Sequence, residues 1–262
     1  MTPTTIALAG LAGALFLMTG VWLASLRKPD ASIIDAFWGP AFVLLAWLYF
    51  GLGSQTIFRQ LLMPVLVSLW GLRLSCYIIW RNWGHGEDPR YAAMRAKYGA
   101  KFPWLSLIIV FWFQGLLAWI IAAPLWKVQI ADGPPGLNWL DALGTLVFFV
   151  GLIFETSADL QLARFRANTA NRGKVLDRGL WRYSRHPNYF GEALVWWGLF
   201  LVVLSTPGAW WTVLSPVLIN FLLLRVSGVT LLESSLKTSK PGYREYIERT
   251  SAFVPWFPRR VA

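Results

Sequence analysis

Long apolar segments recur along the chain and constrain its fold more than any other feature. A helix needs about 20 mostly apolar residues to cross about 30 Å of hydrocarbon. Such segments occur at residues 4–26, 31–51, 61–81, 103–123, 139–162, 188–205 and 208–230. Only 14% of the 262 residues are charged, whereas soluble domains carry about 25%. We therefore expect an all-α, polytopic membrane bundle of about seven transmembrane helices, forming one domain over residues 1–262.

Turn-forming residues separate several of these segments. Residues 124–137 include an Asp-Gly-Pro-Pro-Gly stretch, which predicts a loop. The Ser-Thr-Pro-Gly stretch at 205–208 predicts a very short turn, so the last two spans should form a helical hairpin. Segment 4–26 lacks a basic stretch before it and a small-residue cleavage site after it. We interpret it as a first span and not as a cleaved signal peptide.

The distribution of Lys and Arg predicts the orientation. With seven spans, one side of the membrane receives nearly all the Lys and Arg residues of the connections, and the other receives Arg59 and Lys127. Cytoplasmic connections carry an excess of these residues. We expect the N-terminus outside and the C-terminus in the cytoplasm.

Neither a disulfide framework nor a metal site is expected. The chain has one cysteine, Cys76, and two histidines, His85 and His186. A single cysteine cannot form an intrachain disulfide, and zinc sites combine three or four Cys, His or acidic ligands.

Two predicted connections, 81–101 and 164–192, mix basic, amide, glycine and aromatic residues. Arginine forks match phosphate oxygens, so these connections suit an anion with several phosphates. Positive-inside bias and anionic lipid headgroups also account for most of the individual basic residues. Nucleic acid is not an expected ligand, because the basic residues adjoin the membrane and no nucleic-acid-binding fold fits. Gly-x-Gly-x-x-Gly, P-loop and Ser-His-Asp patterns are absent from the sequence.

Acidic residues inside predicted spans are candidate functional positions, because charges in a bilayer are costly and usually face a cavity. Asp35 lies early in the second span, and Glu155 and Asp159 lie one helical turn apart in the fifth. Glu192 follows Asn188 by four residues, so both project from one helix face. Each residue also fits a structural hydrogen bond or ion pair between helices. We favour a function for Asp159, Asn188 and Glu192, which adjoin a polar connection.

Three further polar residues are weaker candidates for a functional role. Gln114 lies mid-span in the fourth segment and fits a structural or a functional role equally well. Arg73 lies mid-span in the third segment, where a structural pairing with an acidic residue is the simpler interpretation. His186 precedes a proline at the expected start of a helix, which also fits a plain capping role.

Two stretches in the second half of the chain are specific. Residues 179–192 read Gly-Leu-Trp-Arg-Tyr-Ser-Arg-His-Pro-Asn-Tyr-Phe-Gly-Glu. The tail has Leu-Leu-Glu at 231–233, Lys-Pro-Gly-Tyr-Arg-Glu-Tyr at 240–246 and Phe-Val-Pro-Trp-Phe-Pro at 253–258. Together they resemble the steroid 5α-reductase family in its bacterial branch. The resemblance runs from about Asp30 to the end and is strongest over 150–258.

Other membrane enzymes share parts of these stretches. Isoprenylcysteine carboxyl methyltransferases have the Arg-His-Pro-x-Tyr-x-Gly stretch and a similar tail, and sterol C14- and Δ7-reductases share portions. The methyltransferases usually carry a Glu-Glu pair before the tail, whereas Glu233 is followed here by Ser234. The Asp-Ala-Phe-Trp-Gly stretch that begins at Asp35 belongs to the reductase branch. The alternatives are thus an S-adenosylmethionine-dependent methyltransferase of a lipidic substrate and, with little support in the absence of an inverted repeat, a lipid-binding or transport protein.

The resemblance implies a seven-helix membrane fold that binds NADPH from the cytoplasmic side. It implies reduction of the C4–C5 double bond of a 3-oxo-Δ4-steroid or similar enone that enters from the bilayer. The expected location is the inner membrane of a bacterium, with the substrate and membrane lipids as partners and no obligate protein partner. The family's cofactor residues match Arg81, Asn82, Arg90, Tyr91, Asp159, Arg166, Lys174, Arg185, His186, Asn188, Glu192 and Arg225.

Asp35 and Trp38 are the candidate catalytic residues. Steroid reductases of animals hold the substrate carbonyl with an early Gln-Glu pair and a Tyr of the third span. Here Asp35 takes the place of the Glu, and Trp70 occupies the Tyr position. Hydride addition to the β-carbon moves negative charge to the carbonyl oxygen, which a hydrogen-bond donor stabilises. Asp35 can be that donor only as a protonated carboxyl, a form that burial favours.

Overall fold

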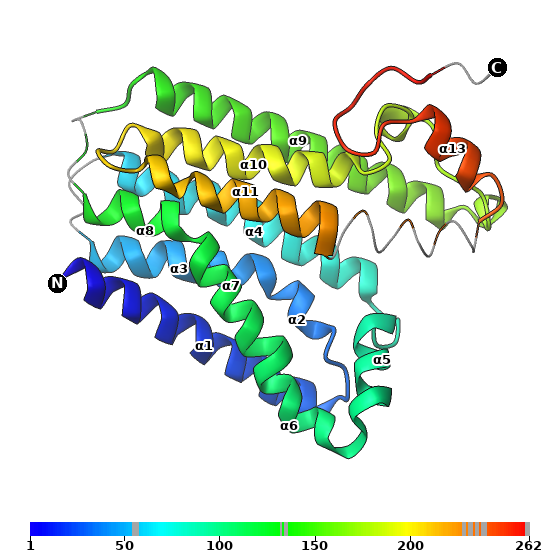
Figure 1. Ribbon diagram of the computed structural model, residues 1–262, viewed down its shortest axis with the longest axis horizontal. Coiled ribbons are helices and arrows are strands. Elements are labelled where there is room, and N and C mark those ends of the chain that lie inside the picture. The colour runs from blue at the N-terminus through cyan, green and yellow to red at the C-terminus, as the bar shows by residue number, and fades with distance from the viewer. Residues whose placement is uncertain are drawn as a thin grey trace. The chain divides into compact units, whose positions relative to one another are not determined.

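The computed structural model describes residues 1–53, 58–131, 133, 136–226, 229, 233, 236 and 240–259. Within these residues the chain is helical and contains no strand, which confirms the all-α prediction (Figure 1). The helices that are long and apolar enough to cross a membrane are Pro3–Arg27, Phe58–Asn82, Pro89–Ile121, Trp139–Ala167 and Pro187–Leu204. Two shorter apolar helical segments are Trp38–Leu52 and Trp210–Val226.

The chain divides into two compact units. Unit 1 comprises Met1–Asp141 and Val202–Thr212, and unit 2 comprises Ala142–Leu201 and Val213–Ala262. Our prediction of a single domain stays a prediction.

Helix α1 (Pro3–Arg27) packs into unit 1 along one stripe. Its buried residues recur every three or four positions, at Ile6, Gly10, Ala14, Met18 and Val21. This is the spacing of one helix face. A Cβ at Gly10 would lie 2.1 Å from the Tyr49 hydroxyl, so the missing side chain lets α3 (Trp38–Leu52) approach closely.

The second predicted span is broken near its start into α2 (Ile33–Ala36) and α3, which meet at Phe37. Pro40 explains the break, because it has no N–H to donate to the carbonyl four residues earlier, at Ala36. The Ser75 hydroxyl of α4 (Phe58–Asn82) donates to that carbonyl instead, at 2.7 Å. The substitute bond satisfies a buried carbonyl and fixes α2, which carries Asp35, against α4.

Glycines allow α3 and α4 to pack with their backbones close together. A Cβ built at Gly39 would lie 2.1 Å from the carbonyl oxygen of Gly71. Such small-residue contacts are typical of helix packing in membranes, where van der Waals contact drives association.

Two segments that we predicted as connections contain helices. Within 81–101, α5 (Pro89–Tyr98) begins at the Asp88 cap, whose side chain accepts a hydrogen bond from the Arg90 amide. Within 124–137, α8 (Ala123–Ile130) has Pro124 in its first turn. The loop prediction was wrong for Pro124–Ile130, because a proline in the first turn of a helix removes no intrahelical hydrogen bond. For 81–101 we predicted a connection and did not anticipate the helix within it.

The candidate crossing Pro89–Ile121 is longer than the fourth predicted span, 103–123. From α5 the chain continues through α6 (Phe102–Ser106), a π-helical stretch (Leu107–Trp112) and α7 (Phe113–Ile121). The predicted short turn at 205–208 is confirmed, and Gly208 adopts a φ of 67° there. Asp132, Pro134 and Pro135 of the predicted loop lie outside the described residues, as do 227, 228 and 230 of the last predicted span.

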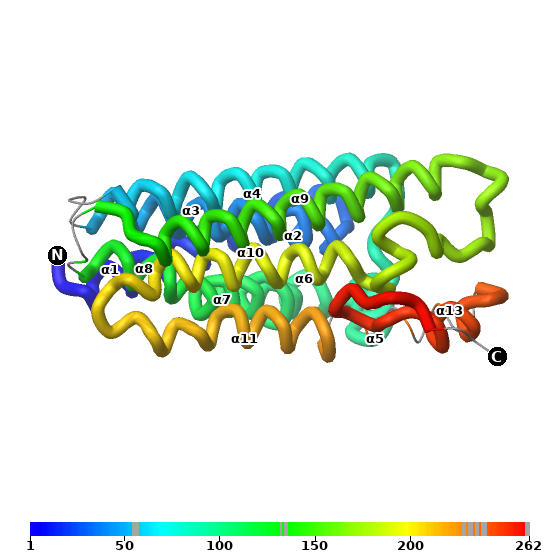
Figure 2. The backbone as a smooth tube through the Cα atoms, turned by 90° about the horizontal axis from the view of Figure 1, so that it is seen from above, coloured from blue at the N-terminus to red at the C-terminus, as the bar shows by residue number. Residues whose placement is uncertain are grey.

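In unit 2, α9 (Trp139–Ala167) and α10 (Pro187–Leu204) run side by side (Figure 2), and glycines let their backbones approach closely. A Cβ at Gly191 would lie 2.4 Å from the backbone nitrogen of Glu155, and one at Gly198 would lie 2.6 Å from that of Phe148. The unit also contains α11 (Leu214–Phe221), a π-helical stretch (Leu222–Val226) and α13 (Tyr243–Arg249). The close packing sets the register in which α9 and α10 present their polar residues.

Candidate functional site

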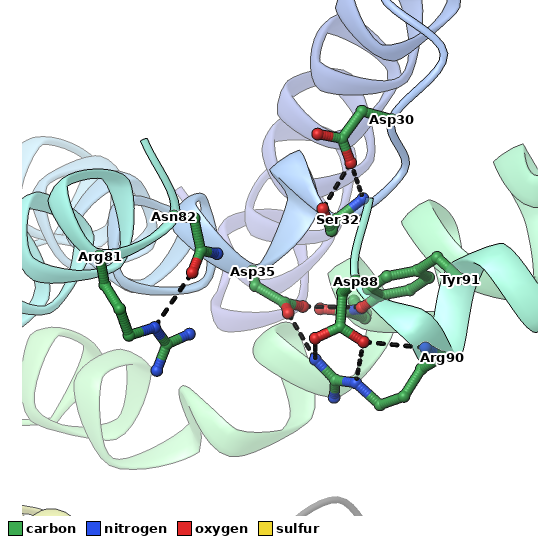
Figure 3. A network of polar contacts seen from close by, with 9 residues as sticks. Asp30, Ser32, Asp35, Arg81, Asn82, Asp88, Arg90 and Tyr91 are labelled. Atoms are coloured by element: carbon green, nitrogen blue, oxygen red, sulfur yellow. Dashed lines mark hydrogen bonds and ion pairs between the residues drawn. The ribbon is translucent and has the colours of Figure 1, made fainter. Parts of the chain in front are cut away.

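Asp35 is the centre of a polar cluster in unit 1 (Figure 3). Its Oδ1 accepts a hydrogen bond of 2.7 Å from the Tyr91 hydroxyl, and its Oδ2 accepts one of 2.7 Å from Nη2 of Arg90. Gln114 of α7 donates from Nε2 to the Tyr91 hydroxyl oxygen at 3.2 Å. Helices α2, α5 and α7 therefore supply one connected network.

The start of α5 places Arg90 and Tyr91 against α2. Asp88 caps the helix and also accepts a 2.9 Å hydrogen bond from Nε of Arg90, which fixes the guanidinium. Burial raises the pKa of the Asp88 carboxyl, but the hydrogen bonds from Arg90 outweigh this and leave it below its ordinary value. An ionised Asp88 at a helix N-terminus is also stabilised by the helix dipole.

Glu87 joins the same region to the connection that follows α1. Its carboxylate accepts hydrogen bonds from the Ala31 amide at 2.8 Å and from the Arg95 guanidinium at 2.9 and 2.8 Å. The hydrogen bonds from Arg95 lower the pKa of the Glu87 carboxyl. The turn before α2 is thus held to α5 by an ionised group.

Asp35 is an acceptor in both of its hydrogen bonds, whereas the sequence suggested that it could be a protonated donor. Each carboxyl oxygen accepts a bond from a different donor, one of which is a permanently charged guanidinium. In this arrangement both carboxyl oxygens act as acceptors, the role that an ionised carboxylate fills best. The geometry therefore suits an Asp35 carboxylate that orients Tyr91, and Tyr91 becomes the better candidate hydrogen-bond donor to a substrate.

Aromatic side chains form an apolar wall beyond Asp35. Trp38, on the first turn of α3, meets Phe42 edge-on with ring centroids 5.2 Å apart. Phe42 in turn lies 5.8 Å from Trp70 of α4, which is fully buried. Phe42 is fully buried as well, so these edge-on and tilted rings pack α3 against α4, and the half-buried Trp38 is the ring of the three that is partly accessible.

Arg81 and Asn82 lie at the end of α4 (Figure 3), and Asn82 lines a cavity. Arg81 donates from Nε to Oδ1 of Asn82 at 3.1 Å, which leaves the Asn82 amide nitrogen oriented as a donor. The cavity has a volume of about 400 Å³, and Asn82, Lys28, Asp30, Ser32, Ile33 and His85 are among its lining residues. Arg81 is also close enough to Asp88 for its positive charge to help lower the pKa of that carboxyl.

The remaining predicted cofactor residues belong to unit 2. Nδ2 of Asn188 donates to Oδ1 of Asp159 at 3.3 Å, a contact between α10 and α9 that we had not predicted. Glu192 lies one turn further along α10 and is half-buried. The exposed basic residues are Arg166 at the end of α9, Lys174 in the following connection, and Arg225 in the π-helical stretch. Their role in cofactor binding stays a prediction.

Arg185 and His186 are both buried in a network with Glu233 (8% and 3% exposed). Arg185 donates from Nε to Oε1 of Glu233 at 2.7 Å, and from Nη1 to the carbonyl oxygens of Thr250 and of Ile247. Nε2 of His186 lies 3.2 Å from the same Glu233 oxygen, and its ring stacks on Tyr189. These contacts tie the start of α10 to the C-terminal segment. They give Arg185 a structural role whether or not it also touches a cofactor.

Sequence reasoning missed Asp88 and Glu233 as site-organising residues. Asp88 had a local signal, because an Asp directly before a Pro is a helix-capping pattern. Glu233 stood out as part of the Leu-Leu-Glu stretch, but its partners lie 47 and 48 residues away in the chain and could not be predicted.

Glu233 should make stability depend on pH. Burial raises the pKa of its carboxyl, but hydrogen bonds from His186 and Arg185 and the charge of Arg185 lower it to about 2, from an ordinary 4.5. A lowered folded-state pKa means that this stabilisation is complete above pH 4.5 and is lost as the pH falls toward 2. Glu233→Gln should lower the free energy of unfolding by about 1.5–3 kcal/mol at neutral pH.

The measurement is the unfolding midpoint in detergent as a function of pH, followed by tryptophan fluorescence. The wild type should lose stability more steeply than Glu233→Gln between pH 4.5 and 2. Glu248→Gln, on an exposed position of α13, is the matched control and should keep the wild-type profile. Parallel profiles for wild type and Glu233→Gln would contradict the role of this carboxylate.

The fold and the site define an all-helical protein with several helices able to cross a membrane and buried polar clusters that hold those helices together. The chain belongs to the family described as "Protein of unknown function (DUF1295)", whose profile matches residues 21–250.

Two curated relatives extend this result. An uncharacterized protein of Schizosaccharomyces pombe, C594.04c, is 26% identical over 267 aligned residues, which cover 90% of this chain and 75% of the relative. Steroid 5-alpha-reductase DET2 of Arabidopsis thaliana is 31% identical over 111 residues, which cover 41% of each protein. No solved structure matches the chain.

Proposed function

We propose that this protein is an integral membrane reductase that uses NADPH to reduce the conjugated double bond of a lipophilic enone, such as a 3-oxo-Δ4-steroid. The observation that carries the proposal is the Asp35–Tyr91–Arg90 cluster, in which a carboxylate and a guanidinium orient a phenol beside an aromatic wall. The partial similarity to a protein named a steroid 5-alpha-reductase supports the same reaction class.

This reduction requires the protein to stabilise negative charge on the carbonyl oxygen of the substrate. NADPH, when bound, supplies a hydride for the β-carbon of the enone. The Tyr91 hydroxyl then donates its hydrogen bond to the developing enolate oxygen in place of Asp35. Gln114 donates to the Tyr91 oxygen and polarises the phenol, while Arg90 holds the Asp35 carboxyl group in position. A proton from water completes the reaction at the α-carbon.

Residues of unit 2 are the proposed cofactor ligands. Arg166, Lys174 and Arg225 are exposed cations of the kind that bind phosphate oxygens, and Asp159 and Asn188 form a polar pair suited to hydroxyl or amide groups. The guanidinium of Arg185 is already bonded to Glu233 and two carbonyl groups. We therefore propose that Arg185 positions the start of α10. Arg166 and Lys174, both exposed, are the proposed ligands of the phosphates.

We further propose that the two shorter apolar segments, Trp38–Leu52 and Trp210–Val226, also cross the bilayer. Together with the five longer helices they give seven crossings, with the N-terminus outside and the C-terminus in the cytoplasm. In that arrangement Arg81, Arg90, Arg166 and Lys174 all lie at the cytoplasmic side, where NADPH is available. The uneven distribution of Lys and Arg supports this orientation.

The test is a turnover assay with purified protein in detergent or nanodiscs. Progesterone or testosterone is added with NADPH, and loss of NADPH absorbance is followed together with the product by mass spectrometry. A product heavier by two hydrogen atoms, and no product from an Asp159→Ala variant of unchanged unfolding midpoint, would support the proposal. Transfer of a methyl group from S-adenosylmethionine by the same preparation would contradict it.

A further inference from the structure

The C-terminal segment exposes large apolar side chains next to buried ones. Val254, Trp256 and Phe257 are 56%, 71% and 76% exposed, respectively. A few residues earlier, Tyr243 and Tyr246 on α13 are buried. Trp and Phe side chains that are both large and mostly exposed at adjacent positions indicate a surface that another phase or molecule covers.

Backbone hydrogen bonds hold this segment in a defined position. The Trp256 amide donates to the Tyr183 carbonyl at 2.9 Å, and the Arg185 amide donates to the Ser251 carbonyl at 2.9 Å. The Ser184 hydroxyl donates to the Phe253 carbonyl at 2.8 Å. The segment 251–256 therefore runs along residues 183–185. We call residues 251–257, which include the exposed aromatic side chains, the strip.

These bonds set the level of the strip relative to α10. Helix α10 is long and apolar enough to cross a membrane and begins at Pro187. Residues 183–185 precede its first turn, so they lie where a crossing helix leaves the hydrocarbon and enters the headgroup region. The Trp256 backbone, bonded to Tyr183, is held at that same level. Trp is enriched at this depth because its ring is apolar and its N–H is polar.

The charges beside the strip match a lipid surface. Arg182 precedes the bonded Tyr183, Arg259 follows Phe257 by two residues, and both are exposed. Arginines next to exposed aromatic residues suit a membrane surface that carries anionic headgroups. By contrast, the exposed acidic residues Glu245 and Glu248 belong to α13, before the strip.

We propose that Val254, Trp256 and Phe257 form an interfacial anchor that inserts into the headgroup–acyl boundary of the membrane that α10 crosses. The anchor holds residues 183–185, and with them Arg185 and the start of α10, at the membrane surface. The occupant of this surface is lipid and not a second protein. The inference does not depend on the reaction that the protein catalyses.

The test places one fluorophore at a time on the strip. Cys76 is the chain's one cysteine and is exposed, so Cys76→Ser gives a background for single cysteines at Trp256→Cys, Phe257→Cys and the control Glu248→Cys. Each variant carries an environment-sensitive label in liposomes that contain anionic lipid. At positions 256 and 257 we expect blue-shifted emission and at least about twofold quenching by lipids with a nitroxide near the headgroup. Position 248 should show water-like emission and little quenching.

Water-like emission at both 256 and 257, with no more quenching than at 248, would overturn the proposal. Two strip positions guard against a label that perturbs one of them, and each variant must keep the unfolding midpoint of the Cys76→Ser protein.

An unlabelled comparison is independent of these variants. Chymotrypsin cleavage after Trp256 of the wild type should be several-fold slower in nanodiscs than cleavage after Tyr98, which is exposed at the end of α5. Equal rates would also overturn it.

Discussion

Asp35→Asn should lower the turnover number of the reductase by about 10²- to 10³-fold, the effect of removing one donor to a developing oxyanion. The amide keeps the size of the side chain but loses its charge, and it presents an N–H to either Tyr91 or Arg90, which are themselves donors. The phenol would lose its orientation and the guanidinium its partner. The measurement is the initial rate with a 3-oxo-Δ4-steroid at saturating NADPH.

Two further variants separate catalysis from folding. Tyr91→Phe removes only the hydroxyl and should lower turnover about as far as Asp35→Asn, and the double variant should cost little more, because the two residues act as a unit. Asp88→Asn is the matched control: it weakens a second contact of Arg90 but leaves both bonds to Asp35. It should keep turnover within about tenfold of the wild type. If Tyr91→Phe turned over as fast as the wild type, Tyr91 would not be the donor.

Asp141→Asn should lower the free energy of unfolding by about 3–5 kcal/mol, because it leaves the Arg59 charge without its counter-ion in the interior. The pair lies within unit 1 and is almost fully buried, with side chains 0% and 1% exposed. Nε of Arg59 donates to Oδ1 of Asp141 at 2.5 Å and Nη2 donates to Oδ2 at 2.6 Å. The Asn138 amide also donates to this carboxylate, at 2.8 Å.

The measurement is the unfolding free energy in mixed micelles, with an exposed ion pair as the control. The side chains of Arg249 and Asp177 are 41% and 46% exposed. Asp177→Asn removes their ion pair and should lower the free energy of unfolding by no more than about 1 kcal/mol. Replacing both buried partners with Arg59→Met and Asp141→Leu should recover much of the loss, since no unpaired charge remains. Equal losses for Asp141→Asn and Asp177→Asn would show that burial does not set the strength of the Arg59 pair.

Much of the helical fold was predictable from local composition. Segments 4–26 and 61–81 correspond closely to α1 and α4, because about 20 consecutive apolar residues leave few alternatives to a crossing helix. The sequence misled us where proline begins a helix, as in α8, and where Pro40 breaks one near its start. Apolar runs indicate where a span lies, whereas capping and lost N–H groups decide where each helix begins and ends.

The candidate site was predictable as a set of residue types but not as a set of contacts. Asp35 stood out because an acid in an apolar segment is costly. Its partners Arg90 and Tyr91 lie 55 and 56 residues further along the chain, and we had placed them with the cofactor. Arg59 shows the same limit: we assigned it to an exposed connection, but its carboxylate partner lies 82 residues away. Such pairs depend on helix packing, which one sequence does not display.

The bond between Ser75 and the Ala36 carbonyl has an evolutionary consequence. Pro40 leaves that carbonyl without its helical donor, and the Ser75 hydroxyl replaces the missing N–H. A homologue with an ordinary amide at position 40 has no need of a hydroxyl at position 75, whereas one that keeps the proline does. Substitutions at these two positions should therefore be correlated across the family, with small hydroxyl side chains at 75 accompanying proline at 40.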